Sequence, residues 1–408
     1  MFSKNGFFHI FSANIINKIV QFATSIIVVR VISKERYGIW SYANNILSFF
    51  LLFEGLGVAS GLLQFASSSK SQEEKLSYLK YALFVGTTFN LILAVIIFLF
   101  SLFFELPVKG STEILRYLSF IPLVTILFNS FQTFLRSDLR NKQFSLVTVS
   151  HTLTFFFGVL IGGYFFGIAG IIWGKYLSYI VSCFIAFWFL KDYLKVFLKV
   201  EISSKRQRTD FLKFSIVCML TNSMSSILYL LDTFLIGIIT KSGTAIASYK
   251  TATLIPFALN FIPSSVMIFA YPYFAKYSED KVLIKEYYLK MLQYLFLLNL
   301  VISTLLIIFA PFIIKVIFGP TYIDAVPPFR LLSFGYLIAG TFSIPSGNVI
   351  ASLKKVKVNF YISVISGGVN IVSDIILIKY FGSIGAAVST VLIFILSSII
   401  SKFTCSSI

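Results

Sequence analysis

Long apolar stretches separated by short polar segments make up almost the whole sequence. A helix needs about 20 apolar residues to cross ~30 Å of hydrocarbon, and by that measure the chain holds twelve predicted spans. They cover residues 10–32, 39–60, 81–104, 114–135, 144–164, 168–190, 212–238, 246–270, 288–314, 329–352, 358–378 and 383–402. The uncharged run from Phe144 to Gly174 holds two of these spans, divided at Gly162-Gly163 and at the Phe166-Gly167 turn.

Composition agrees with this pattern. Hydrophobic residues make up 57% of the chain and charged residues 12%, against roughly 25% charged in soluble domains. We therefore expect an all-α integral membrane protein. A formal net charge of +18 indicates nucleic-acid binding in a soluble protein. Here the loops of a membrane protein account for most of that charge, so no nucleic-acid partner is expected.

The longest polar interval divides the apolar sequence into two similar lengths. It runs from Lys191 to Lys213 and contains seven Lys and Arg residues. Positively charged loops stay on the cytoplasmic side during insertion, and so short a segment cannot bury a core of its own. The predicted organisation is an N-terminal six-helix lobe (1–190), a basic cytoplasmic linker (191–213) and a C-terminal six-helix lobe (214–408).

The distribution of basic residues predicts the orientation. With the N-terminus inside, 22 of the 34 Lys and Arg residues fall in cytoplasmic segments and 10 in outer segments. This asymmetry favours a cytoplasmic location for both termini of a multi-pass protein.

The two halves also share short motifs in the same order. Ile39-Trp40-Ser41-Tyr42 opens the second span and Ile246-Ala247-Ser248-Tyr249 the eighth. An FG-x-x-G turn at Phe166-Gly167 returns at Phe381-Gly382. Because six spans per half is an even number, both halves begin on the same side of the membrane. This predicts a parallel internal repeat with a transport site between the two lobes.

Polar residues form one face of the first span, namely Asn14, Lys18, Gln21 and Ser25. A lysine near mid-membrane costs about 2.5–3.5 kcal/mol on insertion scales and is expected to face water or the bundle interior. Two interpretations stay open for Lys18. Its charge either lines a central cavity or reaches the cytoplasmic headgroups along its aliphatic stem.

Other charged residues lie in or beside the spans. Lys175, Lys250 and Arg30 are candidates for adding positive charge to a cavity. Their alternative roles are interfacial anchoring and topology. Asp232, Asp374 and Glu54 are candidates for ion coupling. Asp232 is also open to a structural pairing with Lys250, which the sequence favours, or to a role as an interfacial carboxylate, and Glu54 is open to pairing with a basic neighbour.

Enzyme signatures are missing from the sequence, which has no P-loop, no G-x-S-x-G elbow and no HExxH motif. The three cysteines and two histidines follow no ligand spacing. We therefore expect no catalytic residues, no metal and no cofactor, and a transporter driven by an ion or substrate gradient.

Several of these motifs together resemble the polysaccharide transporter family (Wzx, the O-antigen flippases), within the superfamily that also holds multidrug and toxin extruders and lipid II flippases. The residues that carry the resemblance are Asn14 to Arg30 followed by Tyr37-Gly38, then Glu54-Gly55-Leu56-Gly57, Asp232 with Gly237 and Tyr249, and the two FG-x-x-G turns. The resemblance covers essentially the whole chain.

That resemblance implies a MATE-like, twelve-helix, two-lobed flippase of the bacterial cytoplasmic membrane. It would move oligosaccharide repeat units on undecaprenyl pyrophosphate by alternating access, for O-antigen or a related surface polysaccharide. The family is described as using a cationic central cavity. Asn14, Lys18, Gln21, Arg30, Lys175 and Lys250 match that role by position and polarity. Membrane lipid, a polysaccharide polymerase and a chain-length regulator would be its partners.

Three rival functions remain at this point. A drug and cation antiporter of the same fold favours acidic groups in its lobes. A membrane-embedded polymerase is expected to carry a large outer loop with catalytic arginines. Here the longest outer gap, around residues 315–328, is short. A structural scaffold would not need polar stripes inside its spans.

Overall fold

A computed structural model describes residues 7–201, 204–277, 280–353 and 355–406, and every regular element in them is helical. The chain forms two compact units, residues 1–230 and 231–408. The first unit contains α1 (Phe7–Val31), α2 (Lys34–Leu51), the 3-10 turn η1 (Glu54–Gly57), α3 (Val58–Ser68), α4 (Gln72–Phe103), α5 (Ser111–Leu118), α6 (Ile121–Ser137), α7 (Asn141–Phe157), the π-helical turn η2 (Gly158–Gly162), α8 (Gly163–Leu190), the turn η3 (Lys191–Tyr193), α9 (Leu194–Lys199) and most of α10 (Lys205–Thr240).

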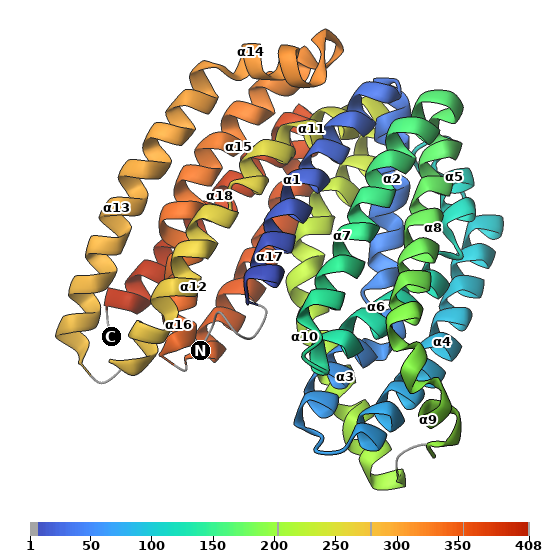
Figure 1. Ribbon diagram of the computed structural model, residues 1–408. Coiled ribbons are helices and arrows are strands. Elements are labelled where there is room, and N and C mark those ends of the chain that lie inside the picture. Colours follow the sequence, from blue (N-terminus) through green and yellow to red (C-terminus); the bar gives the residue numbers. More distant parts are fainter. Residues whose placement is uncertain (1–6, 202–203, 278–279, 354, 407–408) are drawn as a thin grey trace. The chain divides into compact units, whose positions relative to one another are not determined.

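The second unit begins inside α10, and its described regular elements are all helices (Figure 1). It contains α11 (Gly243–Ala258), α12 (Phe261–Lys276), α13 (Lys281–Ile308), α14 (Ala310–Ile313), η4 (Ile314–Phe318), η5 (Pro320–Ala325), α15 (Val326–Ile338), η6 (Ala339–Ser343), α16 (Ile344–Ser352), α17 (Val356–Phe381) and α18 (Ser383–Ser406).

The boundary between the units differs from the predicted linker at residues 191–213, because most of α10 packs on the first unit. Two hydrogen bonds hold it there. Ser223 Oγ donates to the Leu52 carbonyl at 2.8 Å, and Asn45 Nδ2 donates to the Leu230 carbonyl at 3.1 Å. Gly61 leaves room for this contact, since a Cβ there would meet the Phe211 ring at 3.0 Å.

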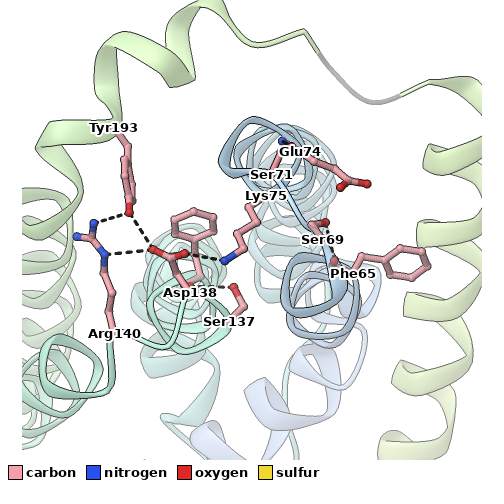
Figure 2. A network of polar contacts seen from close by, with 10 residues as sticks. Phe65, Ser69, Ser71, Glu74, Lys75, Ser137, Asp138, Arg140 and Tyr193 are labelled. Carbon is pink, nitrogen blue, oxygen red and sulfur yellow. Dashed lines mark hydrogen bonds and ion pairs between the residues drawn. The ribbon is translucent and has the colours of Figure 1, made fainter. Parts of the chain in front are cut away.

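Tyr193 of the predicted linker joins a polar network of the same unit (Figure 2). Lys75 Nζ on α4 donates to Asp138 Oδ1 at 2.9 Å, and Tyr193 donates to Asp138 Oδ2 at 3.0 Å. Arg140 bonds both Asp138 and the Tyr193 hydroxyl. Lys80 Nζ donates to the Val200 carbonyl at 2.8 Å. The predicted basic linker therefore contacts the first unit at Tyr193 and Val200.

Each unit contains one helical hairpin that reverses at an FG-x-x-G motif. The long apolar run is broken at Gly167 (φ +60°), and α17 ends against Gly382 (φ +56°). Glycine is suited to both positions because it has no Cβ to oppose a positive φ. The predicted division of this run at Phe166-Gly167 matches the position of the break.

The described helices include seven that are long and apolar enough to cross a membrane, or ten when three bent pairs each count as one span. The bends reach 44° between α2 and the η1–α3 segment and 45° between α5 and α6. The chain is thus an all-α, multi-pass membrane protein, which confirms the predicted class. The number of twelve spans stays a prediction.

Candidate functional site

A buried acidic site lies in the second unit, where the end of α10 meets α11, α17 and α18. Asp232 is only 7% exposed. Its Oδ2 accepts hydrogen bonds from the Tyr249 hydroxyl and, at 2.9 Å, from Thr390 Oγ1. Asn370 Nδ2 donates to Oδ1 at 3.4 Å and to Ser389 Oγ at 3.3 Å. Four helices therefore position one carboxylate.

Asp374 is the second carboxylate of this site and lies one turn after Asn370 on α17. It is fully buried, and neither carboxylate oxygen has a hydrogen-bond partner among the described residues. Its charge interacts with that of Asp232. Two ionised carboxylates in an apolar bundle are each desolvated and repel one another. The pair can relieve that cost by binding a proton or a small cation.

The donor set decides which cations suit the site. Among the described residues no group of three or more His, Cys, Asp or Glu side chains is arranged around a metal position. Two carboxylates with the neutral hydroxyls of Ser389 and Thr390 form an oxygen-only set, which hard cations prefer over soft ones. The arrangement suits a proton or a hard monovalent cation.

Lys250 follows Tyr249 on α11 and is half-buried. It interacts electrostatically with Asp232, but the two form no direct ion pair among the described residues. Tyr249, Thr390 and Asn370 occupy the hydrogen-bonding positions around Asp232 instead. The direct pairing that the sequence left open is not formed, and the positive charge of Lys250 remains near the acidic site.

Lys175 is the best-defined cation of the first unit. Its Nζ donates to Asn44 Oδ1 at 2.8 Å and lies 5.8 Å from the centroid of the Trp40 ring. Asn44 is itself held by a 2.9 Å bond to the Trp40 carbonyl. An amide oxygen and an aromatic face both favour the charged amine without neutralising it. Lys175 is therefore oriented by Asn44 and Trp40, both on α2.

Glu54 lies at the break between α2 and α3, where Gly55, Leu56 and Gly57 all have positive φ. The Asn90 amide stabilises this break by accepting from the Gly55 N–H at 2.7 Å and donating to the Pro122 carbonyl at 2.6 Å. Asn129 Nδ2 lies 3.2 Å from Glu54 Oε2. The partner of Glu54 is thus an amide, and none of the ion pairs among the described residues involves it.

The predicted polar face of α1 is exposed within the first unit. Asn14, Lys18 and Gln21 are all exposed, and so is Arg30 in the last turn. The buried face of α1 contains Ala13, Asn17, Thr24 and Val28 instead. The structure thus groups Asn14, Lys18 and Gln21 on one surface, while Lys175 is held separately by α2 and Lys250 lies in the second unit.

Tyr249 and Thr390 are site residues that sequence reasoning did not assign. Tyr249 appeared in the repeated Ser-Tyr motif and among the residues of the family resemblance, but without a role in the site. Its counterpart in the first half, Tyr42, is fully buried, and its hydroxyl has no partner among the described residues. The internal repeat is the signal that could have identified Tyr249. Both halves have this tyrosine, but only Tyr249 of the second half is bonded to an acidic residue, Asp232.

A family described as "Polysaccharide biosynthesis protein" matches residues 27–327. The chain belongs to this family. The family resemblance expected from the sequence is confirmed, and the matched region includes Glu54, Lys175, Asp232 and Lys250.

Two solved transporter structures share the fold along nearly the whole chain. The lipid II flippase MurJ in an inward closed conformation has a TM-score of 0.76 at 18% identity, covering 97% of this chain and 87% of that one. An inward-facing multidrug resistance MATE family transporter of the MOP superfamily has a TM-score of 0.72 at 17% identity, covering 96% and 95%. At such identities the likeness shows the fold alone, and it confirms the MATE-like architecture.

A curated relative matches a shorter region. The uncharacterized membrane protein MJ1068 of Methanocaldococcus jannaschii is 36% identical over 112 residues, which are 26% of this chain and 22% of the relative. The match therefore spans about a fifth of that relative's length.

Proposed function

We propose that this protein is a flippase that moves oligosaccharide repeat units linked to undecaprenyl pyrophosphate across the bacterial cytoplasmic membrane. The proposal is supported by the family match and the fold match taken together. A chain of a polysaccharide biosynthesis family has, over 97% of its length, a fold like that of a lipid II flippase. The product would serve O-antigen or a related surface polysaccharide, with both termini in the cytoplasm.

We propose this substrate because its diphosphate is negatively charged and the candidate site residues include Lys and Arg. A diphosphate carries several negative charges and needs Lys or Arg to compensate them away from bulk water. Lys175, oriented by Asn44 and Trp40, is the strongest candidate to meet it. Lys18 and Arg30, with the exposed amides of Asn14 and Gln21, would contact the headgroup as it moves, and Lys250 would contribute from the second unit.

Energy would come from a cation taken up by Asp232 and Asp374. Their burial and the unpartnered oxygens of Asp374 support this role. Proton or cation binding there removes the repulsion between the two carboxylates, so occupancy favours one packing of α10, α17 and α18 over another. Glu54, on the helix break of the first unit, is a second candidate for a titrating group.

A drug and cation antiporter is the second candidate function. The acidic pair favours it, since buried carboxylates also attract cationic drugs, and a MATE transporter has the same fold. Lys175 argues against it, because an oriented lysine repels the same drugs. A membrane-embedded polymerase is a weaker alternative. A polymerase and a chain-length regulator are proposed as partners of the flippase.

Complementation of a flippase-null strain tests the proposal. Expression of this chain is expected to restore surface polysaccharide and to remove the accumulated lipid-linked intermediate, identified by mass spectrometry. A matched culture carrying the empty vector gives the background. Undiminished intermediate in cells with the protein in their membrane, together with new resistance to cationic drugs, would support the antiporter instead.

A further inference from the structure

A pocket of about 390 Å³ lies beside the first turns of α10 in the first unit. Its lining residues are Tyr81 from α4 and, from α10, Lys205, Arg208, Thr209, Leu212, Lys213 and Ile216. The α10 residues follow one another at alternating spacings of three and one, which places them on one face of the helix. A single helical face therefore supplies three positive charges to one hollow.

These three cations have no ion-pair partner within the described part of the chain. None of the ion pairs among the described residues involves Lys205, Arg208 or Lys213. The Nε of Arg208 is buried and has no hydrogen-bond acceptor among those residues. Nearby cations are satisfied, because Lys75 bonds Asp138 and Lys80 bonds the Val200 carbonyl. The missing partner of the pocket is an anion.

The remaining lining includes two aliphatic side chains and lies next to a group of aromatic rings. Leu212 and Ile216 lie on the same face of α10, one before and one after Lys213. Phe211 stacks on Tyr78 with centroids 5.7 Å apart and meets Tyr81 edge-on at 5.6 Å. Tyrosines gather at the depth of lipid headgroups in membrane proteins. A cationic rim above an apolar wall at that depth fits a molecule with an anionic head and a hydrocarbon tail.

We propose that this pocket binds the phosphate headgroup of an anionic membrane phospholipid. Arg208 and the two lysines would surround the phosphate, with the Tyr81 hydroxyl as a further donor, and the acyl chains would continue along Leu212 and Ile216. Asp210, the nearest acidic residue along α10, does not line the pocket and is exposed. The site is separate from Lys175 and from the acidic pair. Its ligand anchors the start of α10 to the cytoplasmic leaflet.

Lipid retention by the purified full-length protein tests this assignment without any transport measurement. Native mass spectrometry is run with added phosphatidylglycerol, phosphatidylcholine or inorganic phosphate. The protein is expected to retain phosphatidylglycerol, not phosphatidylcholine. Arg208→Gln is expected to weaken retention about fivefold, as is Lys213→Gln, because each charge near an anionic headgroup contributes about 1 kcal/mol.

Arg206→Gln is the matched control, since Arg206 has the same charge two positions away and is exposed outside the pocket. Its retention of phosphatidylglycerol is expected to equal that of the unmodified protein. Equal losses in Arg206→Gln and in both pocket variants would reduce the effect to diffuse attraction by a basic segment and overturn the proposal. Displacement of phosphatidylglycerol by millimolar inorganic phosphate would overturn it too, since the pocket would then select a free anion.

Discussion

The two FG-x-x-G hairpins have nearly the same backbone although 215 positions separate them. Gly167 has φ 60° and ψ −134°, and Gly382 has φ 56° and ψ −130°. Close packing is repeated as well. A Cβ on Gly170 would overlap the carbonyl oxygen of Gly162, and one on Gly385 would overlap that of Leu377. The offset is the same in each pair, so the turn and its packing are retained in both halves.

The side chains on this shared backbone carry different charges. The same offset pairs Lys175 of the first unit with Thr390 of the second, and Val159 with Asp374. Lys175 is bonded to Asn44, while Thr390 donates to Asp232. One hairpin thus presents a cation and its repeat belongs to a buried acidic site. The comparison agrees with the proposed roles, anion contact in the first unit and cation uptake in the second.

The largest effect is expected from reversing the charge of the first unit. Lys175→Glu is predicted to lower the surface polysaccharide restored in the complementation assay at least about 100-fold. The new carboxylate would lie beside the diphosphate, and like charges placed side by side cost several kcal/mol. Lys175→Arg keeps the charge and is expected to retain most activity. Lys109→Glu, an exposed change of the same kind, controls for net charge. Comparable activity of Lys175→Glu and Lys109→Glu at equal membrane levels would contradict the anion role.

The shared backbone gives the second prediction. Gly170→Ala and Gly385→Ala should destabilise the protein by similar amounts, about 3 kcal/mol each, because each new methyl meets a fixed carbonyl. Thermal stability in detergent measures this. Gly368→Ala is the control, since nothing lies within 4 Å of its added methyl, and helix propensity predicts a slight gain. A large loss of thermal stability in only one of the two variants would contradict equivalent packing in the two hairpins.

Neutralising the acidic pair is predicted to have a smaller effect. Asp374→Asn and Asp232→Asn should each lower gradient-driven flux in proteoliposomes about tenfold, leaving gradient-independent flux unchanged. The asparagine amide has nearly the same shape as the aspartate carboxylate but carries no negative charge to attract a cation. Glu286→Gln is the control, because it neutralises an exposed acid of the same unit on α13. If flux in the Asp232 and Asp374 variants still responds to the gradient, the acidic pair is structural.

The smallest change is expected at the exposed face of α1. Lys18→Ala should lower flux about fivefold, consistent with about 1 kcal/mol for one solvent-exposed charge pair. Lys18→Arg should be nearly neutral, and Lys18→Glu should be the worst of the three, because charge sign governs contact with a diphosphate. Flux assays with equal amounts of each of the three variants in proteoliposomes distinguish these outcomes. Equal flux in all three removes Lys18 from the substrate path.

Much of the helical architecture follows from local sequence. Span length fixes the long helices, and Phe166-Gly167 marks a turn because glycine accepts its positive φ. The break at Glu54–Gly57 depends on the side chain of Asn90, which reaches it from α4. The unit boundary depends on Ser223 and Asn45 bonding across helices. Such contacts between distant segments leave no periodic signal in the sequence.

The candidate site likewise contains some residues that the sequence predicts and others that only the packing shows. Asp232 and Asp374 are conspicuous because carboxylates are costly in apolar spans. Their neighbours Tyr249 and Thr390 are ordinary residues in helical sequence and gain significance only through packing. The same holds for Asn44, which orients Lys175 from a different helix.

Translocation by the purified protein in proteoliposomes tests the central claim most directly. Two synthetic lipids with the same polyprenyl chain and oligosaccharide are compared, one joined by a diphosphate and one by a neutral linker. Rapid transfer of the diphosphate lipid alone, across the bilayer, is the predicted result. Equal transfer of both lipids, or of neither by a correctly folded protein, would contradict it.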